Sequence, residues 1–211
     1  MSELAPAYSR PARLIAYGVV AFAIAFELVV VWLMLHPQVP PDYRGYYIDR
    51  TTTCLNQPVS GEYELGTTVS FRSDGQELAR SLRVCGWEGP AGDGTHAVGT
   101  SSRLRFAIPA AGAGPLFLSL ELVAITRDGH PSQHVLIEGN GAELGTVTAL
   151  AGVPLEVELQ IPQELVAAGG GTLDVTLHFP DAISMSPSDS DTRRRSIKLL
   201  SARLGATAGR N

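Results

Sequence analysis

Basic residues and cysteines are both scarce in this sequence. Of its 211 residues, 16 are Lys or Arg and 21 are Asp or Glu, which gives a formal net charge of -5. Nucleic-acid binding depends on clustered positive charge, and here the basic residues are scattered except for the run from Arg193 to Arg195. We therefore expect no nucleic-acid partner. Two distant cysteines are also too few to build a metal site on their own.

Patterns that signal catalysis are missing as well: a nucleophile beside a base, two carboxylates across a cleft, or a metal with an open position. His130 and His134 are four residues apart, but a neighbouring glycine and proline predict a turn, so a solvated loop is favoured over a metal site. Asp189 and Asp191 have a spacing found in calcium loops, without the glycine and the distal glutamate of such loops. We expect no catalysis, no metal and no cofactor.

One long apolar run is present, LIAYGVVAFAIAFELVVVWLML, from Leu14 to Leu35. Its 22 residues match the thickness of a bilayer core, which predicts a transmembrane helix at residues 14–35. A cleaved signal peptide is the alternative, although its apolar region is normally shorter. Arg10 and Arg13 precede the run and no Lys or Arg follows before Arg44, so residues 1–13 are predicted to be cytoplasmic.

His36, at the outer end of this run, has two readings. A polar residue at the end of a span is the ordinary one, and a ligand to a tetrapyrrole metal between helices is the other. We favour the first.

Glu27 lies near the middle of the apolar run, where an acidic side chain costs about 2.5 to 3.5 kcal/mol. Ala16, Val20, Ala23 and Glu27 fall on one face of a helix, and the alanines would allow another helix to approach closely. We expect this face to contact an integral membrane partner. A protonated glutamate tolerated by the lipid is the alternative.

The remainder of the chain predicts a stalk and one β domain. Residues 36–50 contain three prolines before a group of aromatics, which favours a stiff stalk. In residues 51–204 the apolar period becomes two, as in RLRFAI, LEVELQI and LDVTLHF, with about nine short strands between turn residues. Asn140 and Gly141 give the strongest hairpin signal, and PQELVAA is the one candidate helical turn. We predict an all-β, antiparallel, jelly-roll-like β-sandwich behind a single transmembrane helix, with a flexible tail at residues 205–211.

Cys54 and Cys85 both follow the predicted span, and the charge bias places them outside the cytoplasm. An oxidising compartment permits a disulfide between them, closing a loop of about 30 residues. Two free buried thiols are the alternative.

Three stretches, taken in order, resemble a known family. They are YELGTTVSFRSDGQELARSLRVCGWEGPAGDGTHAVGTSSRLRF, VLIEGNG and LDVTLHFPDAISMSPSDSDTRRRSIKLLSARL. Together they are similar to the carbohydrate-binding-like β-sandwich found at the C-terminal end of bacterial membrane proteins linked to surface-polysaccharide handling. The resemblance implies a bacterial inner-membrane protein with its β domain in the periplasm. Matching positions include Tyr63, Leu65, Gly66, Gly86, Trp87, Pro90, Gly94, Gly99, Asn140, Gly141, Ser186, Pro187, Asp191 and Arg193.

The sequence departs from that family where the family has a glutamate and two later tryptophans, which fall here at Ala91, Asp93 and His96. Flat aromatic faces stack on sugar rings, and of this set only Trp87 remains. Trp87 also has a structural reading, closing one end of the sandwich, and Asp191 with Arg193 has one as a bracket pinning a loop. The candidate ligand or partner surface comprises Trp87, Asp93, His96, Asp191 and Arg193.

Three functions follow from these observations. The first is a non-catalytic accessory subunit that docks its helix and β domain onto a larger membrane complex, favoured by the missing tryptophans and the polar helix face. The second is a membrane-tethered glycan-binding module, favoured by the family resemblance. An enzyme acting on that polysaccharide is the third, and no sequence signal supports it. We rank the accessory subunit first.

Overall fold

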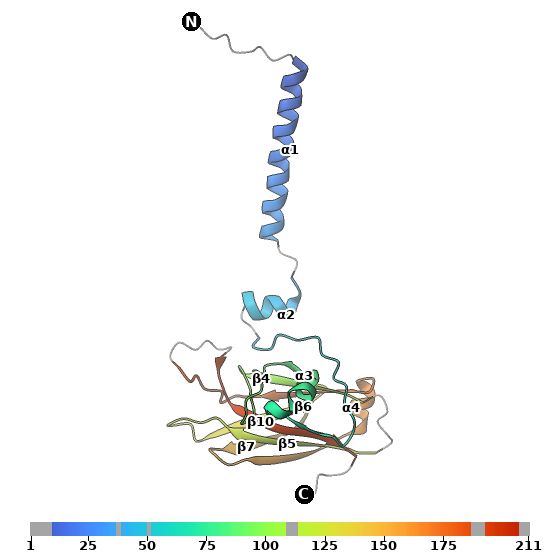
Figure 1. The fold of residues 1–211 in the computed structure, drawn as a ribbon, viewed down its shortest axis with the longest axis vertical. Coiled ribbons are helices and arrows are strands. Elements are labelled where there is room, and N and C mark those ends of the chain that lie inside the picture. The colour runs from blue at the N-terminus through green and yellow to red at the C-terminus, as the bar shows by residue number, and fades with distance from the viewer. Residues whose placement is uncertain (1–9, 37–38, 50–51, 109–113, 187–192, 207–211) are drawn as a thin grey trace. The chain divides into compact units, whose positions relative to one another are not determined.

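The computed structural model describes residues 10–36, 39–49, 52–108, 114–186 and 193–206 (Figure 1). Contacts divide the chain into two compact units, residues 1–40 and residues 41–211.

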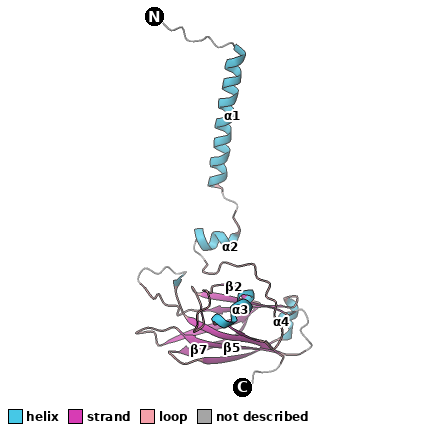
Figure 2. Ribbon diagram, viewed as in Figure 1, coloured by secondary structure: helices cyan, strands magenta, loops and turns pink. Residues whose placement is uncertain are grey.

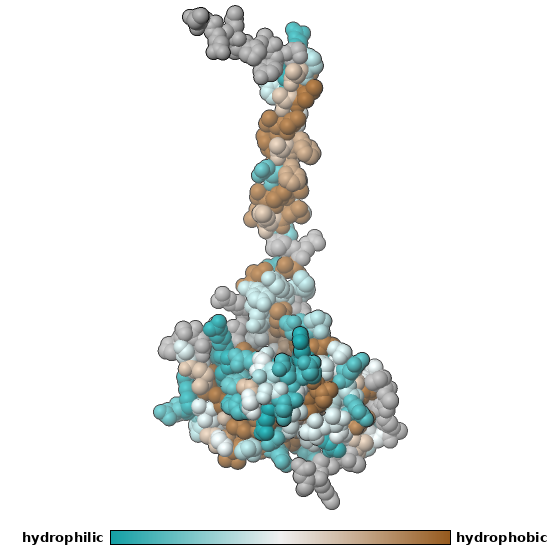
Figure 3. All heavy atoms as spheres, in the orientation of Figure 1, coloured by the Kyte–Doolittle hydropathy of each residue, from teal (hydrophilic) through white to brown (hydrophobic). Residues whose placement is uncertain are grey.

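Helix α1 runs from Arg10 to Leu35, so it begins four residues before the predicted span. At 1.5 Å per residue its 26 residues extend about 39 Å. Hydrophobic side chains cover most of it (Figure 3), and none of its residues is buried against the rest of the chain. Among the described residues, α1 is the one helix long and apolar enough to cross a membrane.

The region predicted to be a stalk, residues 36–50, contains a short helical segment. A short α2 (Pro41–Tyr43) leads into η1 (Arg44–Ile48), a turn of π-helix. Proline is well suited to the first position of a helix, and here all three prolines precede or begin the helical segment. Arg44 Nε lies 3.1 Å from Asp49 Oδ2 and holds the ends of this turn together.

Two five-stranded antiparallel sheets form the second unit, with the strands stacked in two layers (Figure 2). The first sheet has the order β2 (Arg83–Cys85), β4 (Ser101–Ala107), β9 (Thr172–His178), β6 (Ser132–Gly139), β7 (Ala142–Leu150). The second has the order β1 (Thr68–Ser70), β10 (Ile197–Gly205), β5 (Leu116–Ala124), β8 (Leu155–Ile161), and β3 (Thr95–His96) also pairs with β10. This confirms the predicted β-sandwich.

Alternating burial along the strands builds the core. In β4, β5 and β9 every second side chain is buried, as the period-two pattern predicted. The inward residues of both sheets join one cluster that includes Phe106, Leu118 and Leu177, each with no exposed surface. Burying a side chain of this size contributes about 1.5 to 3 kcal/mol, so the cluster is the main source of the domain's stability.

The segment from Tyr63 to Phe71 is a turn followed by the short strand β1. The Tyr63 hydroxyl accepts a hydrogen bond from the Leu204 N–H at 2.8 Å and donates to the Thr67 carbonyl. Burial raises the pKa of this tyrosine. Because Tyr63 ties the turn to β10, its match to the family's opening motif has a structural explanation.

Two further short helices were not predicted from the alternation: η2 (Ser73–Gly75) and α3 (Gln76–Leu82). α3 buries Ala79 and Leu82, three residues apart, which is helical spacing within a segment too short to give a clear periodic signal. The predicted helical turn is present as α4 (Gln163–Ala168). β10 continues to Gly205, one residue into the predicted tail, and residues 207–211 of that tail lie outside the described residues.

The predicted hairpin is present between β6 and β7. Asn140 has φ 48° and Gly141 has φ 81°, the left-handed pair that a tight two-residue hairpin requires. The Asn140 amide also donates to the carbonyls of Leu165 at 2.7 Å and Thr172 at 3.0 Å. Its Oδ1 accepts from the Asp174 N–H at 2.8 Å. The asparagine therefore fastens the hairpin to the connection between α4 and β9.

Candidate functional site

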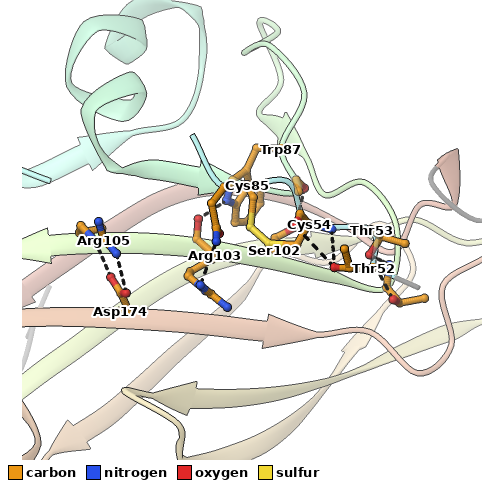
Figure 4. Close-up of a disulfide and its surroundings, with 12 residues drawn as sticks. Thr52, Thr53, Cys54, Cys85, Trp87, Ser102, Arg103, Arg105 and Asp174 are labelled. Atoms are coloured by element: carbon orange, nitrogen blue, oxygen red, sulfur yellow. Dashed lines mark hydrogen bonds and ion pairs between the residues drawn. A yellow bond between two sulfur atoms is a disulfide. The ribbon is translucent and has the colours of Figure 1, made fainter. Parts of the chain in front are cut away.

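Cys54 and Cys85 form a disulfide, as predicted, across a sequence separation of 31 residues. The bridge fixes the segment before Tyr63 along the edge strand β2, and the Gln57 N–H strengthens this attachment by donating to the Val84 carbonyl at 2.7 Å. Figure 4 shows the bridge beside Trp87 and next to β4. The disulfide thereby holds an irregular segment where it forms a wall.

That wall belongs to an open groove of about 700 Å³, called here the disulfide groove. Three segments line it: the π-helical turn at residues 46–47, the disulfide-bonded segment at residues 53–59, and residues 80–89 from the end of α3 through β2. Val98 completes the lining. Its volume lies within the range of about 300 to 1,000 Å³ that is typical of small-ligand sites.

Trp87 is placed in this groove by the glycine before it. Gly86 has φ 75°, and a Cβ at that position would lie 2.2 Å from the Ser101 carbonyl oxygen, so only glycine fits. The Trp87 indole Nε1 donates to the Arg103 carbonyl at 2.9 Å (Figure 4). Its ring centroid lies 6.2 Å from that of Phe71. The indole is therefore held in one orientation, packed against the core and lining the groove.

Tyr46 and Tyr47 supply two more aromatic rings to the groove. Their centroids lie 4.8 Å apart in an edge-to-face arrangement, and Tyr47 remains 53% exposed. The sequence prediction assigned both to the stalk and missed them. The signal that points to them is the group of three tyrosines in YRGYY directly before the β domain.

Charged groups at the groove come from Arg80, Arg83 and Glu88. Arg83 Nη1 donates to the Glu88 carbonyl. Burial lowers the pKa of Arg83, and the charge of Arg80 lowers it further. The Glu88 carboxylate forms an ion pair with Arg195.

Asp93 and His96, where the family has tryptophans, belong to a charged network beside the groove. Asp93 pairs with Lys198 Nζ, whose hydrogen bond and charge lower the pKa of that carboxyl. His96 faces Lys198 in the pairing of β3 with β10, and its Nδ1 lies 4.0 Å from Glu88 Oε2. Burial lowers the pKa of His96, assisted by the charge of Lys198 and opposed by that of Glu88. These positions form an ion network in place of a stacking surface.

The remaining candidate residues are apart from the groove or outside the description. Asp191 and Asp189 lie outside the described residues. Arg193 is exposed, and its carbonyl accepts a hydrogen bond from Arg195 Nη1 at 2.8 Å. Ala16, Val20, Ala23 and Glu27 all lie on the exposed surface of α1, in the other unit of the chain.

The histidines weighed as metal ligands have other partners. His130 lies in the predicted turn, and His134 is in β6, where its Nδ1 contacts the Asp181 carboxylate. His36 Nδ1 lies 2.9 Å from the Trp32 carbonyl. Across the described ranges, no three His, Cys, Asp or Glu side chains gather as they would around a metal ion.

No protein-family model matches the sequence, and no curated protein matches it. Solved structures that resemble this chain include carbohydrate-binding modules. One is a family 22 xylan-binding domain from Paenibacillus barcinonensis, with 16% identity, TM-score 0.42, and coverage of 67% of this chain and 99% of that one. Another is a family 36 module in complex with calcium and xylotriose, with 11% identity, TM-score 0.38, and coverage of 66% and 99%. A family 6 carbohydrate-binding module has 12% identity and TM-score 0.39, and the match covers 72% of this chain and 100% of that module.

Proposed function

We propose that this chain is a non-catalytic, membrane-tethered glycan-binding protein, and that the disulfide groove is its binding site. The observation that carries the proposal is the composition of the groove, where Tyr46, Tyr47 and Trp87 lie together with polar groups of Gln57 and the arginines. A pyranose ring has an apolar face that packs on aromatic rings and a rim of hydroxyls that need hydrogen-bond partners. The groove offers both kinds of contact in one cavity.

Rigidity of the groove favours this use. Trp87 is held by its hydrogen bond to Arg103, and the disulfide-bonded segment is held by the bridge at Cys54. Side chains that are ordered before a ligand arrives lose little entropy on binding, which improves affinity for a weakly interacting ligand such as a sugar.

The position of the groove in the chain supports a role at a membrane surface. Only 10 residues lie between Leu35, the last residue of α1, and Tyr46, and even a fully extended chain spans at most about 40 Å from one to the other. If α1 spans the bilayer, with residues 1–13 in the cytoplasm, a glycan bound in the groove is kept close to the outer face of that membrane.

A polysaccharide-binding assay with the full-length protein in lipid nanodiscs tests the proposal. The probes are purified bacterial capsular, exopolysaccharide and O-chain polysaccharides. We expect at least one to bind, with Trp87→Ala and Tyr47→Ala each weakening affinity about tenfold, which corresponds to about 1.4 kcal/mol. Leu150→Ala removes an exposed apolar side chain outside the groove and serves as the matched control.

Trp87→Ala also removes contacts with the core and could unfold the domain. Trp87→Phe, which keeps an aromatic ring there, and Tyr47→Ala, at a residue that is exposed, are variants expected to keep the fold. Binding that is equal in wild type, Trp87→Phe and Tyr47→Ala would place the glycan elsewhere. Failure of every polysaccharide to bind would overturn the proposal.

A second function, as an accessory subunit of a larger membrane complex, is favoured by α1. The face formed by Ala16, Val20, Ala23 and Glu27 carries a carboxylate on an otherwise apolar helix, and none of these residues is buried. We propose that an integral membrane protein contacts this face and that the β domain presents the glycan to it. The two functions are compatible because they use separate units of the chain.

A further inference from the structure

Two arginines lie close together on one wall of the disulfide groove. Arg80 is in the last turn of α3, and Arg83 is the residue that caps this helix and begins β2. Both line the groove, and their charges interact unfavourably with each other. Like charges placed this close are destabilising unless an opposite charge compensates them.

Within the described chain, neither arginine has a carboxylate partner. The nearest acidic group of the groove, Glu88, forms its ion pair with Arg195, and it is the one acidic residue among those that line the cavity. By contrast, Arg105 and Arg195 each pair with a carboxylate. The positive charge of the groove is therefore uncompensated in a chain whose net charge is -5.

Arg83 also has unused hydrogen-bonding capacity. Its Nη1 donates to the Glu88 carbonyl, while its Nε is buried and has no hydrogen-bond partner in the described part of the chain. A guanidinium group presents its donors as a planar fork that matches two oxygens of a carboxylate or a phosphate. An anion bound at this fork would satisfy the buried donor and neutralise the arginine pair.

We propose that the disulfide groove is selective for acidic saccharides, with Arg83 and Arg80 binding a carboxylate or phosphate group of the sugar. This inference rests on the proposed glycan-binding function and names the chemical class of its ligand. Tyr46, Tyr47 and Trp87 contact the sugar ring, and the arginines contact its acidic substituent. Arg83 makes the larger contribution, because it is partly desolvated while Arg80 is exposed.

Two pairs of matched probes test this selectivity with the full-length protein in nanodiscs. The carboxylate pair is hexagalacturonic acid and its full methyl ester. The phosphate pair is pentamannosyl phosphate and its dephosphorylated form. In wild type we expect the acidic member of at least one pair to bind about tenfold or more tightly than its neutral partner. Which pair shows the preference distinguishes a uronic acid from a sugar phosphate.

Arg83→Gln should abolish this preference by weakening the acidic member much more than the neutral member. Arg80→Gln should reduce it by a smaller factor, and Arg83→Lys, which keeps the charge without the fork, should restore it only in part. Arg72→Gln removes an exposed arginine that does not line the groove and should leave the preference intact. Raising the salt concentration should weaken binding of the acidic probe alone.

The outcomes separate this inference from the proposed function. Equal affinity for acidic and neutral members, or a preference unchanged in Arg83→Gln, would overturn the inference and leave the groove as a neutral glycan site. The same conclusion follows if only neutral polysaccharides bind in the panel described above. If no probe and no polysaccharide binds, the glycan-binding function itself fails.

Discussion

Removal of the Cys54–Cys85 bridge should weaken both the domain and its groove. A bridge between residues 31 apart restricts the unfolded chain, and the loop-entropy relation gives a stabilisation of about 3.7 kcal/mol at 25 °C for a loop of that length. Native domains typically have a total stability of about 5 to 15 kcal/mol, so this loss is a large share. The released segment forms one wall of the groove, and binding should suffer with it.

Urea unfolding of the full-length protein in detergent measures this loss. Trp32 and Trp87 are the two tryptophans, so a Trp32→Phe background leaves Trp87 as the fluorescent reporter of the β domain. We expect the double variant Cys54→Ala with Cys85→Ala to lose about 3 to 4 kcal/mol in unfolding free energy. Reduced wild type serves as the comparison, because it separates loss of the bridge from the packing loss at the nearly buried Cys85.

Two results would refute this reasoning. A loss below about 1 kcal/mol would mean that the bridge does not restrict the unfolded chain as the loop length requires. An unchanged glycan affinity in the reduced protein would mean that the disulfide-bonded segment is not a functional wall of the groove.

Three other properties of the structure give further predictions. Asn140→Gly keeps a residue that tolerates the left-handed turn but removes three side-chain hydrogen bonds. The unfolding free energy, measured in urea, should therefore fall by about 1 to 3 kcal/mol. An unchanged value would show that these bonds do not anchor α4. The pKa of His96 is lower in the folded domain than in the unfolded one, where it is about 6.5. As pH falls below about 6.5, the unfolded state takes up this proton before the folded state does, so the stability of the domain should decrease. His96→Gln, which keeps the surrounding Glu88, Asp93, Lys198 and Arg195, should make the unfolding free energy less dependent on pH between pH 7 and 5. Parallel pH profiles for the variant and the wild type would show that His96 is not responsible. Glu27→Leu should reduce recovery of a co-purifying membrane partner more than Glu27→Gln, and equal recovery of both with wild type would reduce α1 to an anchor.

Much of the fold could be predicted because its signals are local. The alternation in RLRFAI, LEVELQI and LDVTLHF corresponds to β4, β8 and β9, where one sheet face packs on the core and the other meets solvent. The Asn140–Gly141 turn follows from the backbone geometry that a tight hairpin requires. The short helices α3 and η1 were missed because fewer than two turns of helix give no periodic signal. α3 is held by the burial of Ala79 and Leu82, whereas η1 buries no residue.

The candidate site was harder to predict because it joins distant parts of the sequence. Tyr46 and Trp87 are about 40 residues apart, and only the fold brings both to the same groove. The family resemblance directed attention to Asp93 and His96, but Asp93 pairs with Lys198, about 100 residues later, and His96 lies beside Glu88, which pairs with Arg195. The sequence alone ranked the accessory subunit above the glycan-binding module, because the missing tryptophans counted against glycan binding. The tyrosines of η1, which the sequence analysis did not consider, reverse this order.

Hydrogen–deuterium exchange of the full-length protein in nanodiscs, with and without a polysaccharide that binds it, tests the central claim most directly. If the disulfide groove is the glycan site, the ligand should slow exchange in residues 44–48, 53–59 and 80–89, the segments that line or support the groove. Exchange in the β6–β7 hairpin, which does not line it, should be unchanged. Protection confined to strands outside those three segments, in a protein that binds the polysaccharide, would contradict the account.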